Sequence, residues 1–152
     1  MKKIGEYTVR GKLTETEAET SNGFKIHLFD GRFDTGFRIV SFDIFPSTWS
    51  SSTTPDCIGK LGTESGLVDG AVNFMNADDN REIAWAGNNG GLDTGGQTFS
   101  IVDPDNMIIE DLFIYVRGSQ DAADVNYMVK LEKYDITDWQ GALSMVRNKS
   151  QG

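Results

Sequence analysis

His27 and Cys57 are the side chains best placed by type to supply nucleophilic or acid–base chemistry, and each is the sole residue of its kind in the 152-residue chain. A catalytic serine or cysteine needs a base that a third group holds in place, so His27 would have to be that base. It alternates with the apolar Phe24 and Ile26, which predicts a solvent-facing side chain. Cys57 has no CxxC partner and is predicted to be a small core residue. We therefore expect no catalytic residues and no enzymatic activity.

Acidic side chains cluster in residues 78–82, 103–106 and 121–124, and their oxygens could bind a hard cation. No cluster has the EF-hand spacing, and Asp and Asn are common in turns because they bond to their own backbone. We predict turns here, with no metal site and no cofactor. A hydrolase that uses Asp78 and Glu82 would need two carboxylates at a set separation in a cleft, and is the weakest of the functional hypotheses.

Charge and composition exclude further classes of function. The chain has 14 Lys and Arg against 23 Asp and Glu, a net charge of -9, so nucleic acid is a poor partner. The glycine-rich segment 87–96 lacks the pattern of a phosphate-binding loop or a dinucleotide fingerprint. No apolar run is long enough to span a membrane. The first residues carry positive charge without the apolar region of a signal peptide, so we expect the protein to fold in a cytoplasm and to stay or be packaged there.

The three tryptophans are candidates for molecular recognition. Trp49 and Trp85 lie near predicted loops, where an exposed indole could stack on a sugar or anchor a protein interface. The alternative, which we favour, is an indole that closes the end of the core. Trp139 belongs to a predicted helix and is expected to be packed.

The remaining pattern is that of short strands. Strict alternation over residues 7–13 places Tyr7 and Val9 on the apolar face of a half-buried strand. Strands are also predicted at 24–29, 37–45, 57–61, 72–75, 83–86, 107–116 and 125–134. The apolar run at 37–45 indicates a strand covered on both faces or at the centre of a sandwich. Residues 107–116 and 125–134 are expected to pair as an antiparallel hairpin.

A helix is predicted at the end of the chain, over residues 137–149. Thr137 and Gln140 match a capping box, and Trp139, Leu143 and Val146 continue an apolar stripe that begins at Ile136. A helix of this length is marginal in water by itself. It must therefore pack against its own sheet or against a neighbouring chain. We expect a single domain, residues 1–152.

Three segments resemble small structural proteins of marine tailed bacteriophages: 103–113 (DPDNMIIEDLF), 125–132 (VNYMVKLE) and 145–151 (MVRNKSQ). The resemblance implies a virion protein with a β-sandwich core, one that decorates or cements the capsid. The expected fold is thus mainly β, an antiparallel, jelly-roll-like sandwich with one short C-terminal α-helix.

Two functional hypotheses follow from these features. The first is a capsid decoration protein that forms a homo-oligomer and binds the major capsid protein or other virion proteins, with its final location in the virion after assembly in the host cytoplasm. Its contacts would use strand addition at the N-terminal segment and the helix, which makes Tyr7, Val9, Trp139, Leu143 and Val146 interaction candidates. The second is a carbohydrate- or receptor-binding module that uses Trp49, Trp85 and the 87–96 segment.

Overall fold

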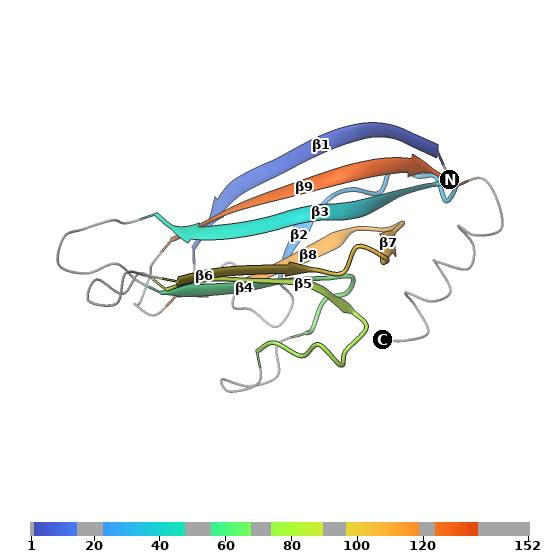
Figure 1. The fold of residues 1–152 in the computed structure, drawn as a ribbon. Helices are drawn as coiled ribbons and strands as arrows, with labels where there is room; N and C mark the ends of the chain where they lie inside the picture. The colour runs from blue at the N-terminus through green and yellow to red at the C-terminus, as the bar shows by residue number, and fades with distance from the viewer. Residues whose placement is uncertain are drawn as a thin grey trace.

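The computed structural model describes residues 2–14, 23–47, 56–67, 74–89, 97–118 and 124–136. In this part of the chain the strands form two antiparallel sheets that pack as a sandwich (Figure 1) and no helix occurs. Sheet A has four strands, in the order β1 (Lys2–Leu13), β9 (Val125–Asp135), β3 (Thr35–Pro46) and β7 (Met107–Ile108). Sheet B has five, in the order β2 (Phe24–Ile26), β8 (Leu112–Gly118), β4 (Cys57–Gly62), β5 (Glu82–Asn89) and β6 (Gln97–Val102).

The strand pairs are nested along the chain. β1 pairs with β9, β2 with β8, β3 with β7 and β4 with β5, so the first strands pair with the last. Strand β6 is added beyond β5 at the edge of sheet B. The β-sandwich prediction is confirmed at this level. Of the described residues, none belongs to a helix long and apolar enough to cross a membrane.

One continuous core lies between the two sheets. Its most deeply buried side chains include Phe42, Val129 and Leu131 of sheet A and Leu112 and Ile114 of sheet B. Alternate residues of each strand point into this layer, as two-residue periodicity requires. The predicted alternation in β1 is confirmed at Leu13, which is 1% exposed, and at Val9, which packs against the core.

Strand β3 shows why an apolar run can be misread. The register shifts between Ile39 and Ser41, so Val40 forms a bulge, and an extra residue in one strand reverses the later alternation. Ile39 and Phe42 both face the core, whereas Val40 is 51% exposed. The strand is central in its sheet, but the predicted burial of both faces is wrong.

The predicted hairpin of residues 107–116 with 125–134 is also wrong. Residues 107–116 are split between β7 in sheet A and β8 in sheet B. β8 pairs with β2 and β4, and β9 pairs with β1 and β3. The chain changes sheets at residues 109–111. Asp111 lies at this crossing, where its carboxylate accepts hydrogen bonds from the backbone N–H groups of Leu28 and Phe29 (2.9 and 3.0 Å).

Other predicted elements have mixed outcomes. The strands at 57–61 and 83–86 are confirmed as parts of β4 and β5, and β2 is shorter than predicted. Residues 74 and 75 are not in a strand, while residues 72 and 73 lie outside the described part. Strand β6 was missed. The predicted helix at 137–149 lies outside the described residues, but Ile136, where its stripe begins, is buried with Met107 and Ile109.

Candidate functional site

The first candidate surface is the one predicted around Tyr7 and Val9 on β1. β1 pairs only with β9 among the described strands, so its other edge faces no strand there. The Tyr7 side chain is 50% exposed, and its ring packs edge-on against Phe37 with 6.1 Å between centroids. Val9 is partly buried against the core. The structure thus leaves Tyr7 available for contacts and uses Val9 for packing.

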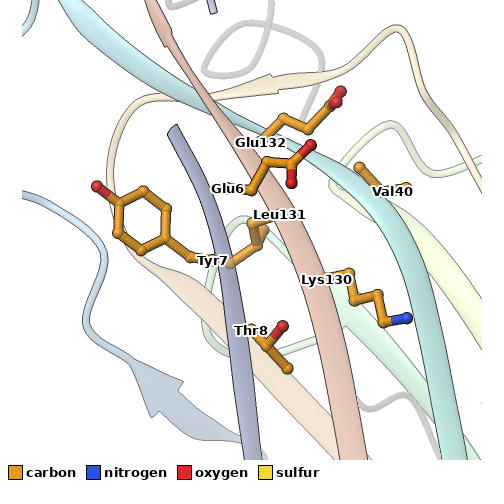
Figure 2. A pocket seen from close by; sticks show the side chains of 7 residues that line it. All are labelled: Glu6, Tyr7, Thr8, Val40, Lys130, Leu131 and Glu132. Carbon is orange, nitrogen blue, oxygen red and sulfur yellow. The ribbon is translucent and has the colours of Figure 1, made fainter. Parts of the chain in front are cut away.

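A hollow of about 350 Å³ lies on the outer side of sheet A, beside Tyr7 (Figure 2). In Figure 2, the side chains of Glu6, Glu132 and Val40 lie to one side of β1, and the Tyr7 ring points away from them. Hydrogen bonds from Lys3 and Arg38 lower the pKa of Glu132 to about 2. A carboxylate held so far below neutral pH is a poor general base. The hollow is therefore a charged surface feature in which Glu132 is held as a paired carboxylate.

The second candidate surface lies on the outer face of β5 and β6 and includes Trp85. Trp85 pairs with Ile101 and Gly87 pairs with Phe99 in the register of these strands. Phe99 and Ile101 are 45% and 58% exposed, and the Trp85 side chain is partly buried. A Cβ atom at Gly87 would lie 2.2 Å from the Phe99 ring, so the ring occupies the space that the glycine leaves. We call Trp85, Phe99 and Ile101 the β6 patch.

Trp85 does not close the end of the core, which was the favoured interpretation from sequence. Its side chain lies on the same face of β5 as Gly87, away from the core residues Ala84 and Ala86. Its indole Nε1–H donates to Glu82 Oε1 at 3.0 Å. The other predicted interaction residues, Trp49, Trp139, Leu143 and Val146, lie outside the described residues.

Sequence reasoning missed a buried ion pair between Lys60 of β4 and Glu82 of β5. The Lys60 side chain is 0% exposed and the Glu82 side chain 1%, with 3.0 Å between Nζ and Oε2. Lys60 Nζ also donates to the main-chain oxygens of Leu67 and Phe74, at 2.5 and 2.6 Å. Residues on both sides of the undescribed segment 68–73 are thereby tied to one ammonium group. The pair lies on the outer face of sheet B, which residues 63–67 and 74–81 cover.

The Glu82 carboxylate receives hydrogen bonds from four donors. Oε1 accepts from the backbone N–H of Asn76 at 2.9 Å and from the Trp85 indole at 3.0 Å. Oε2 accepts from Lys60 Nζ at 3.0 Å and from Asn76 Nδ2 at 3.3 Å. A buried carboxylate is tolerated when it is paired and fully hydrogen-bonded. These contacts fix its position and orientation.

Two aromatic side chains lie beside the Lys60 ammonium. Its Nζ lies 4.9 Å from the centre of the Phe74 ring and 5.4 Å from that of Tyr115. Tyr115 is 0% exposed, and its burial raises the pKa of the phenol to about 12. The Tyr115 hydroxyl remains protonated and donates to the main-chain oxygen of Glu64 at 2.7 Å. Leu67, Phe74 and Tyr115 form a second small hydrophobic cluster here.

The other chemically active residues are where the sequence placed them. Cys57 is buried in the core, and this burial raises its thiol pKa to about 11. His27 is exposed just after β2. Two of the predicted turns are present, at Asp79, which accepts the backbone N–H of Arg81 (3.0 Å), and at Asp103, which accepts that of Asp105 (3.1 Å). Residues 121–123 of the third predicted turn lie outside the described residues. Across the described ranges, no group of His, Cys, Asp and Glu is arranged to hold a metal ion.

Asp78 and Glu82, the pair considered for a hydrolase, differ in their surroundings. Asp78 is exposed, whereas Glu82 is buried against Lys60.

In comparisons with known proteins, no family model, no curated protein and no solved structure matches this chain.

Proposed function

We propose that the chain is a non-enzymatic virion structural protein, a capsid decoration or cement protein that binds the shell and self-associates. The resemblance of its C-terminal segments to structural proteins of tailed bacteriophages motivates this proposal. On this proposal its location is the virion, reached after assembly in the host cytoplasm. Its partners are the major capsid protein or other virion proteins, and a second copy of itself.

The nested strand pairs support a jelly-roll form of the sandwich. A jelly roll is a two-stranded ribbon rolled up so that the first strand pairs with the last and the second with the one before it, and β1–β9, β2–β8, β3–β7 and β4–β5 follow that rule. Jelly rolls recur in viral capsid and lectin domains. The fold supports the proposal by analogy only, because one fold serves many functions.

The observation that carries the proposal is the β6 patch at an open sheet edge. β6 contains no charged residue, and β5 is its only strand partner in the described chain. An edge of this kind is a ready template for pairing with another chain unless charges protect it. β1 is also an edge, but Lys2, Lys3 and Lys12 line it, and lysines on an edge oppose strand addition. We therefore place the protein contact at β6 and leave β1 as the secondary edge.

The exposed apolar side chains at β6 fit a protein partner. Phe99 and Ile101 are large hydrophobic groups that stand clear of the core, and buried aromatic anchors dominate the energy of protein interfaces. The proposed helix at 137–149, with Trp139, Leu143 and Val146, would add a second apolar surface. It would dock on its own sheet or on a neighbour.

Co-sedimentation with capsid shells assembled from the major capsid protein tests the proposal, with native mass spectrometry for the oligomeric state. We expect an oligomer that binds the shells, and Ile101→Lys should abolish both properties. Val40→Lys is the matched control, since Val40 is a similarly exposed strand residue on sheet A. A monomer that does not bind the capsid shells would overturn the proposal. Undiminished shell binding by Ile101→Lys would overturn the role of β6.

The alternative function is a carbohydrate- or receptor-binding module of a phage appendage. The favouring observation is that Phe99 exposes aromatic surface and the half-buried Trp85 lies on the neighbouring strand, which together offer a platform on which a sugar ring can stack. The indole N–H of Trp85 is already bonded to Glu82, so polar contacts would come from elsewhere. Binding on a glycan array that Phe99→Ala removes would favour this function over capsid decoration.

A further inference from the structure

Lys60, Asn76 and Glu82 form an arrangement that the structural role proposed above does not use. The amine nitrogen of Lys60 and the amide nitrogen of Asn76 both contact one atom, Glu82 Oε2, at 3.0 and 3.3 Å. The other carboxylate oxygen accepts the backbone N–H of Asn76 at 2.9 Å. An amine and a carboxamide are therefore hydrogen-bonded to the same carboxylate oxygen, which can serve both as a proton acceptor.

Two of these three side chains, Lys60 and Glu82, are shielded from water, and Asn76 is half-buried. The Lys60 side chain is 0% exposed and that of Glu82 is 1% exposed. Phe74 and Tyr115 place their rings about the amine, with centroids at 4.9 and 5.4 Å. Reactive groups that are preorganised can react without a separate cofactor, since proximity replaces a bimolecular encounter.

We propose that Lys60 and Asn76 become joined by a side-chain amide bond, with Glu82 as the proton carrier. Glu82 takes a proton from the Lys60 ammonium, and the free amine attacks Asn76 Cγ. The Nζ–Cγ bond forms and the Cγ–Nδ2 bond breaks. Nδ2 departs as ammonia after it receives the first proton through Glu82. Glu82 then takes the second proton that Nζ must lose and passes it to the ammonia, which becomes ammonium, so that Glu82 ends as a carboxylate. No oxidant, reductant or co-reactant is needed.

The bond would fix the segment that covers the outer face of sheet B. Lys60 is in β4, and Asn76 is in the covering segment that precedes β5. A covalent link between them closes a loop that contains residues 63–67 and 74–76, and closing a loop restricts the unfolded chain. The same geometry without the bond is a non-covalent clamp, in which the ammonium donates to the main-chain oxygens of Leu67 and Phe74.

Intact mass spectrometry of the full chain in denaturant distinguishes the bond from the clamp. We expect a mass lower than that of the sequence by one ammonia molecule. Asn22 and Asn89 each precede a glycine, and succinimide formation at such sites also releases ammonia. The bond must therefore be located by peptide mapping.

Trypsin cannot cleave after an acylated lysine, so the mapped product should be a single peptide, residues 39–81, that lacks one ammonia. A second cleavage after Glu64 should leave its two parts still joined. Lys60→Arg, Asn76→Ala and Glu82→Gln should each restore the full mass, while Asn89→Ala should retain the linked peptide.

The wild-type chain alone decides the existence of the bond, so a variant that fails to fold does not weaken the test. A full-length mass equal to that of the sequence, or an ammonia loss that maps to Asn22 or Asn89, would overturn the proposal. A linked peptide that persists in Glu82→Gln would overturn the role assigned to Glu82. None of these results depends on whether the protein binds a capsid.

Discussion

Replacing Glu82 by glutamine changes one functional group, and it should lower the free energy of unfolding more than most substitutions of this kind in the chain. All the groups that point at the carboxylate are donors: Lys60 Nζ, both nitrogens of Asn76 and the Trp85 indole. The NH₂ group of a glutamine amide is itself a donor, so it would face some of these donors without forming a hydrogen bond. The Lys60 ammonium would be left without its paired negative charge. Removing one partner of a buried ion pair costs about 3–5 kcal/mol, which is a large share of the about 5–15 kcal/mol that holds a typical domain folded.

The assay is equilibrium urea unfolding of wild-type protein and Glu82→Gln, followed by tryptophan fluorescence and by circular dichroism. Lys60→Met combined with Glu82→Gln should recover part of the loss, because no unpaired buried charge remains. If the Lys60–Asn76 bond forms, the wild-type chain holds an amide in place of the ion pair, and Glu82→Gln also loses about 3 kcal/mol, the value expected for closing a loop of about 15 residues.

Glu6→Gln provides the control for this experiment, since Glu6 pairs with Lys3 at the surface, where its side chain is 72% exposed. The free energy of unfolding of this variant should match that of wild type, because exposed ion pairs contribute little. A loss below about 1 kcal/mol for Glu82→Gln would refute the reasoning, since the buried charge would then not need its partner. A double variant less stable than Glu82→Gln would refute it too.

The pKa of Glu132 is lowered from 4.5 to about 2 by hydrogen bonds from Lys3 and Arg38, so its stabilising effect is full above pH 4.5 and disappears as the pH falls toward 2. When the free energy of unfolding is measured against pH, Glu132→Gln should lack this part of the decrease that wild type shows in acid. Equal slopes for the two proteins would contradict the lowered pKa of Glu132. Gly62→Ala places a Cβ atom 2.3 Å from Leu67 and should destabilise the fold by about 1–3 kcal/mol in urea unfolding. The Cys57 thiol, with its pKa raised to about 11 by burial, should resist thiol reagents at pH 8 in the native state and react after unfolding; rapid native labelling would show that it is accessible.

The positions of most strands could be predicted from the sequence, because a strand buried on one face carries its own alternating signal. β1 and β9 are examples. Pairing between strands could not be predicted in the same way. Residues 107–116 are apolar except for Glu110 and Asp111 and look like one strand, yet the chain changes sheets within them, at Asp111. The crossing depends on hydrogen bonds to residues 28 and 29, which are more than 80 positions away in sequence.

β6 was missed for a different reason. Its residues, Gln97–Val102, are exposed or half-buried throughout, so the strand has no strong apolar alternation to reveal it. The same property makes the strand functionally interesting, because an uncharged and exposed edge strand is costly to keep unless it has a partner. A sequence signal did exist in Phe99 and Ile101, which are spaced by two.

The Lys60–Glu82 pair was hidden because each residue looks ordinary in its local context. Lys60 stands in a short strand between apolar neighbours, where a solvent-facing lysine is the usual interpretation, and Glu82 looks like part of an acidic turn. Two features of the fold bring them into contact: the antiparallel pairing of β4 with β5 and the return of the chain over sheet B. A useful signal was the apolar Phe74 and Met75, which are not in a strand but cover the outer face of sheet B.

The two outer faces of the sandwich therefore have different roles. On sheet A the outer face carries paired charges such as Arg38 and Glu132. On sheet B the described residues of the covering segment bury Lys60, and Phe99 and Ile101 are, among the described residues, large apolar side chains exposed on that face. If the Lys60–Asn76 bond holds the cover in place, it also sets the boundary of the β6 patch. A variant that loses the bond should then bind a partner at β6 with altered affinity although no residue of the patch has changed, and equal affinity would show that the cover and the patch act independently.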